Sequence, residues 1–389
     1  MNKMRSMKHP LDNIKIIDLT SYIAGSYATT LLADLGADVI KVESPAGDGF
    51  RMMAGSFQGW NRGKRGTIVD LTKATGREAF YRLAHEADVV VENYRPGVTQ
   101  KLGVDYDKLR AIKEDIVYCS VTGYGQTGPS VKLPAFDPLM QAQSGSMQAQ
   151  GGEGNPPVFL RIAITDYAAA MVAASGIVAA LVHTARTGEG QYLETSMVNA
   201  AVAIQAAELM SYDGKPVTRY LGEMGVEATY RLYRANDGWL FLSCQDDRSW
   251  TKAMQVLDRL DLGKRYPDES SRRNNDARIA LELEAVFAQG GLTAWVQRLQ
   301  AAGVRCAMSR NMIDFHGDAW AAKSGLTVAT ESPDAGPVKQ MGAAIKFSET
   351  PSVIWGPAPS HGQHTDEVLI EVGYSGEDIV QLRDTGAVR

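Results

Sequence analysis

Short apolar runs alternate with helix-like segments through the first third of the chain. The runs predicted as strands are Ile14–Thr20, Ala37–Glu43, Thr67–Leu71, Asp88–Asn93 and Ile116–Gly123. Helices are predicted between them, at Tyr22–Leu35, at the amphipathic segment ATGREAFYRLAHEA and at YDKLRAIKED. Strands that alternate with helices form βαβ units with parallel strands. This pattern therefore predicts an open α/β domain with a mostly parallel sheet.

The pattern changes after Phe136. From there to about Met210 it predicts long helices rich in small residues. The stretch YRLYRANDGWLFLSC predicts a hairpin that turns at Asn236-Asp237-Gly238, and helices dominate Ser249–Ala302. We therefore predict a smaller central α+β domain over residues 223–311. The large domain is expected over 1–222, and residues 312–389 are expected to return to it with two short helices that meet at Gly373.

Composition narrows the class of protein. The 389 residues carry a net charge of −5, which argues against a nucleic-acid partner. Three widely spaced cysteines without a C-x-x-C pair indicate a reducing compartment and no disulfide framework. No apolar signal core follows the basic N-terminus, so a cytoplasmic protein is expected. The apolar run 164–183 is rich in Ala, with Gly and Ser, and poor in Leu and Phe, which favours a buried helix over a membrane span.

The stretch VYCSVTGYGQTGPS contains a G-x-G-x-x-G pattern at Gly123, Gly125 and Gly128. In a dinucleotide-binding protein the glycines lead directly into a helix whose N-terminal amides hold the pyrophosphate. Here they lead into Pro129, and no acidic residue ends a strand about twenty positions later. We therefore reject a nicotinamide site and predict a glycine-rich loop at the carboxyl edge of the sheet, where α/β proteins bind ligands.

Asp166 is the ionisable group of greatest interest. It lies in ITDYAAAM, at the start of an apolar helix. Because helix N-termini stabilise negative charge, the carboxylate is expected to stay ionised. Local sequence leaves two roles open, a helix cap and a carboxylate nucleophile beside a partly dry pocket, and caps are the commoner role.

Other polar clusters carry weaker predictions. His361 and His364 have a spacing that a metal site could use, but no third ligand is apparent, so no metal is predicted. Arg62, Lys64 and Arg65 in NRGKRG, and Arg95 and Lys101 in ENYRPGVTQK, are either a solvated basic surface or a seat for a phosphorylated ligand.

Six stretches in order resemble the class III CoA-transferases, the CaiB/BaiF family. They are LADLGADVIKVESPAGDGFR, NRGKRGTIVDL, DVVVENYRPGVTQKLGVDYDKL, SVTGYGQTGP, ARTGEGQYLETSM and HTDEVLIEVGYSGEDI, and they are spread over nearly the whole chain. The resemblance implies a Rossmann-like large domain built from both chain ends, a smaller central domain, and two chains interlocked as rings in a homodimer. It also implies transfer of CoA from an acyl-CoA to a free carboxylic acid. CoA and acyl-CoA would be substrates, with no tightly bound cofactor.

The resemblance places the reacting carboxylate at Asp166. In the family an Asp attacks the donor thioester to give a mixed anhydride, and the released thiolate then forms an aspartyl-CoA thioester. The acceptor acid reverses these steps, and water must be kept out because anhydrides hydrolyse. Contacts to CoA are carried over to Ile23, Ala24, Val69, Thr72, Asn93, Tyr94, Arg95, Lys101, Phe136, Asp137 and Met197.

Two positions depart from the family pattern. Ser44 stands where some transferases have an Arg against the adenosine part of CoA. The stretch YLGEMGVEATY has only Gly222 and Gly225 where many oxalate-acting members carry a glycine run that closes over the intermediate. These departures weaken any specific prediction of formyl-CoA and oxalate as substrates, and the segment between Tyr212 and Tyr230 is expected to help sort the acyl groups.

Two other functions stay open from the sequence. The same family includes α-methylacyl-CoA racemases, which pair an Asp with a His to move a proton next to the thioester. The His position aligns with Phe136, which cannot accept a proton. The chain could also serve as a non-catalytic partner subunit that completes a dimer, although it retains Asp166.

Overall fold

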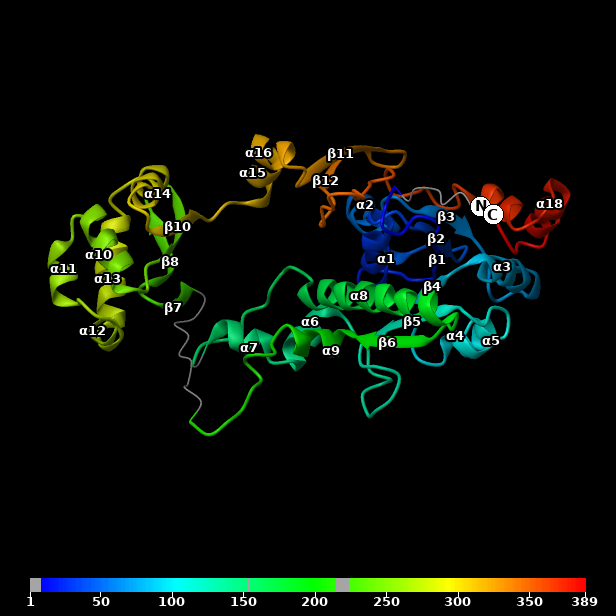
Figure 1. Ribbon diagram of the computed structural model, residues 1–389, viewed down its shortest axis with the longest axis horizontal. Coiled ribbons are helices and arrows are strands. Elements are labelled where there is room, and N and C mark those ends of the chain that lie inside the picture. The colour runs from blue at the N-terminus through cyan, green and yellow to red at the C-terminus, as the bar shows by residue number, and fades with distance from the viewer. Residues whose placement is uncertain (1–7, 153, 215–223) are drawn as a thin grey trace. The chain divides into compact units, whose positions relative to one another are not determined.

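A computed structural model describes residues 8–152, 154–214 and 224–389 (Figure 1). The described residues form two compact units. The first contains residues up to 144 together with 161–209 and 318–389, and the second contains 145–160 and the described part of 210–317. The predicted boundaries were 222/223 and 311/312. Residues 145–160, which the sequence analysis placed in the large domain, group with the central segment.

A six-stranded parallel sheet forms the centre of the first unit, in the order β3-β2-β1-β4-β5-β6. The strands are β1 (Lys15–Asp18), β2 (Asp38–Glu43), β3 (Arg65–Ile68), β4 (Val89–Glu92), β5 (Val117–Thr122) and β6 (Tyr192–Ser196). The predicted parallel α/β sheet is thus confirmed. The order reverses between β1 and β4, so the loops that follow these two strands diverge and leave a crevice at the carboxyl edge.

One strand of this parallel sheet was missed. β6 lies in a segment for which the sequence analysis predicted helices. Its sequence YLETS pairs with β5 along the edge of the sheet, and its first three residues are at least partly exposed. An edge strand with a polar residue inside it lacks the apolar run by which the other strands were recognised.

Helices cover both faces of this sheet (Figure 1). On one face α1 (Ala24–Asp34) packs against α8 (Ile164–Thr187), and small residues such as Ala169 and Ala173 are fully buried there. On the other face α3 (Ala74–Glu86), α17 (Thr365–Glu371) and α18 (Gly376–Asp384) share a core with the strands. Alternate strand residues, such as Ile16 and Ile17, point into the two cores.

Shorter elements complete the first unit. They are η1 (Gly49–Met52), α2 (Ala54–Asn61), α4 (Val98–Leu102), α5 (Tyr106–Arg110), α6 (Asp137–Gln143), α9 (Met197–Ala203), α16 (Ala319–Lys323) and the hairpin β11 (Thr327–Ser332) and β12 (Gly336–Met341). Within the described ranges, α8 is the one helix with the length and apolar composition to span a membrane. That criterion is weak, because core helices of water-soluble proteins also meet it.

The second unit has an antiparallel sheet in the order β10-β9-β8-β7. Its strands are β7 (Gly225–Glu227), β8 (Tyr230–Ala235), β9 (Gly238–Ser243) and β10 (Arg305–Met308). Its helices are α7 (Ser146–Gly151), α10 (Asp247–Val256), α11 (Leu260–Arg265), α12 (Glu269–Asn274), α13 (Asp276–Phe287), α14 (Leu292–Ala301) and α15 (Met312–Gly317). The predicted hairpin is confirmed, with Ala235 paired to Gly238 at its turn.

Candidate active site

A cavity of about 360 Å³ opens at the carboxyl edge of the parallel sheet. The loops after β1, β4 and β5 form its walls, as the reversal of strand order at β1 and β4 requires. Eight of the twelve predicted site residues line it, namely Ile23, Ala24, Asn93, Tyr94, Arg95, Phe136, Asp166 and Met197. The predicted residues that line this one cavity therefore lie up to 174 positions apart in the sequence, from Ile23 to Met197.

Asp166 lies in the first turn of α8 and lines the cavity. It is not the N-cap, which is Ala163, and no side chain caps this helix end. Burial raises the pKa of Asp166 to about 7, the negative charge of Asp137 adds to the rise, and a hydrogen bond from the Ala24 N–H opposes it. The carboxylate that was expected to stay ionised is therefore ionised only in part near neutral pH, because loss of hydration and the charge of Asp137 outweigh the hydrogen bond from Ala24.

Asp137 begins α6 and is buried. One of its oxygens accepts hydrogen bonds from the Thr165 backbone N–H and hydroxyl, both at 2.7 Å, and the other accepts from Gln141 Nε2 at 2.5 Å. Its side chain is thus bonded to protein groups, and it is not among the residues that line the cavity. In this arrangement Asp137 fixes the first turn of α8, and its predicted contact with CoA stays a prediction.

The turn after β4 supplies four of the lining residues, from Asn93 to Pro96. Asn93 Oδ1 accepts from the Ser21 N–H at 2.9 Å and Asn93 Nδ2 donates to the Ser21 carbonyl at 2.7 Å. The Tyr94 N–H donates to Glu92 Oε2 at 2.8 Å, and burial raises the pKa of Glu92 to about 7. Arg95 is exposed and is the one lysine or arginine among the described lining residues.

Three predicted CoA contacts lie outside the lining. Val69 is buried and forms a bridge with Val388. The N–H and hydroxyl of Thr72 both bond to Asp70 Oδ1 in a turn. Lys101 is exposed on α4, the helix that follows the Asn93–Gly97 turn. Their assignment to CoA stays a prediction.

The basic cluster NRGKRG is neither a solvated surface nor a phosphate seat. Arg62 is fully buried against Asp34, and Lys64 Nζ lies 2.8 Å from Asp18 Oδ2 with both side chains fully buried. Arg65 pairs with acidic residues of β2 and α17. Both predictions were wrong for Arg62 and Lys64, which are neutralised inside the fold, whereas Arg65 forms its ion pairs at the partly exposed surface.

The ion pair of Asp18 and Lys64 is strongly coupled. Burial acts to raise the pKa of Asp18, but the ammonium groups of Lys64 and Lys41 outweigh it and lower that pKa to about 2. Burial lowers the pKa of Lys64 to about 8, with Asp18 opposing the change. Both groups are therefore charged near neutral pH, and Asp18 also accepts hydrogen bonds from Thr20 in the loop after β1.

The glycine loop leads into no helix, as predicted. Residues 123–136 are irregular, and α6 starts only at Asp137. Gly125 and Gly128 have φ values of 89° and 101°, which favour glycine. A Cβ on Gly123 would lie 2.0 Å from the Cβ of Ala135. The glycines therefore serve turn geometry and close packing around the cavity.

Two aromatic residues of the cavity wall, Tyr22 and Phe50, were missed by the sequence analysis, whereas Tyr94 and Phe136 were predicted. The Tyr22 ring meets the Phe50 ring at a centroid distance of 5.2 Å and the Phe136 ring at 6.4 Å, both edge to face. Tyr22 and Phe136 are about half exposed, so their rings face the cavity. Tyr22 also has a φ of 65°, which is rare for a residue with a side chain. No sequence pattern signals this conformation in a tyrosine.

The remaining sequence candidates take other places. His364 Nδ1 accepts from the Gly66 N–H at 3.0 Å, and His361 Nε2 lies 3.2 Å from the Ser44 carbonyl oxygen. In the parts of the chain that the structure describes, no group of three His, Cys, Asp or Glu residues could hold a metal ion. Gly222 lies outside the described residues, and Gly225 begins β7.

Comparisons with known proteins agree with this geometry. The CoA-transferase family III profile matches residues 11–365. Succinyl-CoA:mesaconate CoA-transferase of Haloarcula hispanica is 34% identical over 93% of this chain and 96% of its own length. Succinyl-CoA:glutarate CoA-transferase of Homo sapiens is 31% identical over 97% of this chain and 90% of its own.

A solved structure supports the same assignment. The crystal structure of a CaiB/BaiF family protein from Brucella suis superposes with a TM-score of 0.86 at 30% identity, covering 94% of this chain and all of that one. The mixed α/β fold, the matched profile and the named relatives thus indicate the same family. The chain belongs to family III of the CoA-transferases and is an enzyme of this class.

Proposed function

We propose that the protein moves CoA from an acyl-CoA thioester to a free carboxylic acid, with Asp166 as the nucleophile. The observation that carries the proposal is the position of this carboxylate in a 360 Å³ cavity, where it receives the Ala24 N–H. A carboxylate whose pKa lies near 7 is partly desolvated and more nucleophilic than an ordinary aspartate, yet it is substantially ionised at neutral pH.

Four bond exchanges complete the reaction. An Asp166 oxygen attacks the thioester carbonyl, the C–S bond breaks, and a mixed anhydride and CoA thiolate result. The thiolate attacks the aspartyl carbonyl and releases the first acid, which leaves an aspartyl-CoA thioester. The acceptor carboxylate attacks this thioester to form a second anhydride and thiolate. Finally the thiolate attacks the acyl carbonyl of that anhydride, which frees Asp166 and the new acyl-CoA.

The other lining residues have roles in this scheme. The backbone at Ile23 and Ala24 and the side chains of Phe136 and Met197 would flank the pantetheine arm. Arg95, and Lys101 on the helix that follows its turn, would pair with the CoA phosphates. The aromatic rings of the cavity would limit the access of water to the anhydride.

The racemase alternative is less well supported. The described lining residues include no histidine, lysine or cysteine that could act as a second base beside Asp166, and Phe136 occupies the aligned position. Neither a racemase nor a non-catalytic partner subunit would form an acylated aspartate.

Trapping with hydroxylamine distinguishes these functions. The protein is incubated with an acyl-CoA and then with hydroxylamine, and the peptide with Asp166 is analysed by mass spectrometry. Succinyl-CoA is the first donor to test, because relatives from Haloarcula, human and mouse are named for it. A hydroxamate at Asp166 is expected. Its absence with every donor in a panel that supports turnover would exclude the covalent scheme.

Asp166→Ala gives the matched control. This variant should lose CoA exchange and hydroxamate formation, while it keeps its affinity for CoA. Near-normal turnover would end the assignment of the nucleophile. The panel of donors and acids would also identify the preferred substrates.

We further propose that the enzyme works in the cytoplasm as an interlocked homodimer, as the family resemblance implies. Light scattering after gel filtration should give twice the 42.1 kDa mass of one chain. A monomer mass in active fractions would contradict the dimer.

A further inference from the structure

The loop after β1, residues 20–24, carries the amide that faces Asp166. Tyr22 in this loop has a φ of 65°, a left-handed conformation that persists in a residue with a side chain only when its surroundings enforce it. Its ring and the following Ile23 line the cavity, and Ala24 begins α1. Contacts with other parts of the fold must therefore hold this strained loop in place beside Asp166.

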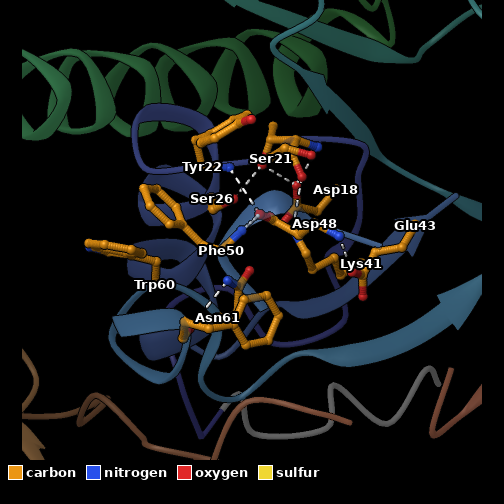
Figure 2. A network of polar contacts seen from close by, with 12 residues as sticks. Asp18, Ser21, Tyr22, Ser26, Lys41, Glu43, Asp48, Phe50, Trp60 and Asn61 are labelled. Carbon is orange, nitrogen blue, oxygen red and sulfur yellow. Dashed lines mark hydrogen bonds and ion pairs between the residues drawn. The ribbon is translucent and has the colours of Figure 1, made fainter. Parts of the chain in front are cut away.

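Buried charges hold the loop from one side (Figure 2). Asp18 Oδ1 accepts from the Thr20 N–H at 2.8 Å and from the Thr20 hydroxyl at 2.5 Å. Lys41 Nζ donates to the Thr20 carbonyl at 2.8 Å and pairs with Asp48 at 3.0 Å. Lys41 and Asp48 are fully buried as side chains, so this anchor is sheltered from solvent.

Asn93 holds the loop from the other side. Its amide oxygen and nitrogen bond to the N–H and carbonyl of Ser21, at 2.9 and 2.7 Å. This pair of bonds joins the turn after β4 to the loop after β1, across the point where the strand order reverses. Both polar groups of the Asn93 side chain are engaged with Ser21, which leaves one lone pair and one N–H for any other partner.

We propose that Asn93 is a positioning residue, which acts with the buried Lys41 to keep the Ala24 N–H directed at the Asp166 carboxylate. The inference rests on the proposed role of Asp166 as the nucleophile. It gives the Asn93 side chain a different task from the CoA contact that the family resemblance implies. The same turn still presents the Arg95 side chain to the cavity.

The charged groups around Asp166 set the expected pH response. Of these, Asp137 at the start of α6 raises the pKa of Asp166 directly, Arg95 in the turn after β4 lines the same cavity, and Ala24 on α1 contributes its N–H. Removing an N–H bond from a carboxylate disfavours its charged form and raises its pKa. A loosened loop should therefore move the acid limb of the rate profile to higher pH.

Asn93→Ala tests the proposal on the full-length protein. Asn93→Ser is a second variant in case the first folds poorly, and neither adds a charge near Asp166. Asn275→Ala is the matched control, since Asn275 Nδ2 also donates to a backbone carbonyl, that of Ser271 at 2.9 Å, but lies in the other compact unit. Three experiments are done: steady-state kinetics that give kcat and KM for the acyl-CoA, the pH profile of kcat, and hydrogen exchange of a peptide spanning residues 18–27.

We expect faster exchange of the 18–27 peptide, a kcat lower by about tenfold to a hundredfold, a KM for acyl-CoA within about threefold of wild type, and an acid limb at higher pH. The control should match wild type in all three. A raised KM with unchanged kcat and exchange would make Asn93 a CoA ligand and overturn the inference. Faster exchange with unchanged kcat and pH profile would overturn it too. Failure of the proposed function itself is separate, since it would appear as turnover in Asp166→Ala.

Discussion

Replacing Asp166 by Asn should stabilise the folded protein, although it should abolish catalysis. In the folded protein the pKa of this carboxyl is about 7, whereas its ordinary value is 3.8. Folding therefore takes up a proton between about pH 4 and pH 7, and the free energy of unfolding of the wild type falls as pH rises through that window. Asn carries no charge at any of these pH values and still offers an oxygen to the Ala24 N–H.

The size of the effect follows from the two pKa values. A difference of about three pH units corresponds to ~4 kcal/mol, which is the cost of keeping the ionised carboxylate in its folded surroundings above pH 7. The gain of Asp166→Asn over wild type should thus be near zero below pH 4, grow between pH 4 and pH 7, and level off at up to ~4 kcal/mol above that.

Urea denaturation followed by circular dichroism at several pH values between 4.5 and 8.5 measures this gain. Glu114→Gln removes an exposed carboxylate and is the control, which should show no comparable pH-dependent gain. A gain of the same size at pH 5 and pH 8 would mean that packing, and not charge, explains it. A loss of stability at pH 8 would refute the assigned surroundings of Asp166.

Other perturbations test the neighbouring groups. Asp137→Asn removes the charge that helps to raise the pKa of Asp166, so the acid limb of kcat/KM should move to lower pH; an unchanged or higher limb would contradict that coupling. Gly123→Ala forces a methyl group to within 2.0 Å of Ala135 Cβ and should reduce kcat/KM, whereas Gly55→Ala, whose Cβ meets nothing within 4 Å, should not. Lys64→Met leaves Asp18 buried without its partner and should lower the free energy of unfolding by about 3–5 kcal/mol. The double variant with Asp18→Asn should lose less than the sum of the single changes, and strictly additive losses in urea denaturation would argue against the pair.

The sequence was sufficient for features that depend on local periodicity. Five strands of the parallel sheet, the hairpin at Asn236-Asp237 and the helix that carries Asp166 follow from apolar patterns and turn residues. The sixth strand was not predicted, because its sequence YLETS contains polar residues and lacks a continuous apolar run. Most of the cavity lining was also predicted, since the family motifs lie in the loops at the carboxyl edge.

Predictions from the sequence failed for properties that depend on residues far away in the chain. The local sequence of NRGKRG suggests exposed cations. In the fold, Arg62 and Lys64 pair with Asp34 and Asp18, which lie 28 and 46 positions away in the sequence. The raised pKa of Asp166 depends on burial by the loop after β1 and on Asp137, which no local rule includes. The strained backbone of Tyr22 is likewise imposed by residues outside its own segment.

The last two helices have a consequence for how the chain is made. The first five strands have left the ribosome long before α17 and α18, which cover one face of their sheet. About 170 residues separate the end of β6 at Ser196 from the start of α17 at Thr365, which is ~10–30 seconds of translation. During that interval the part of this apolar face that α3 does not cover stays exposed on the nascent chain, so a stop codon before Thr365 should yield a product that chaperones retain or proteases degrade.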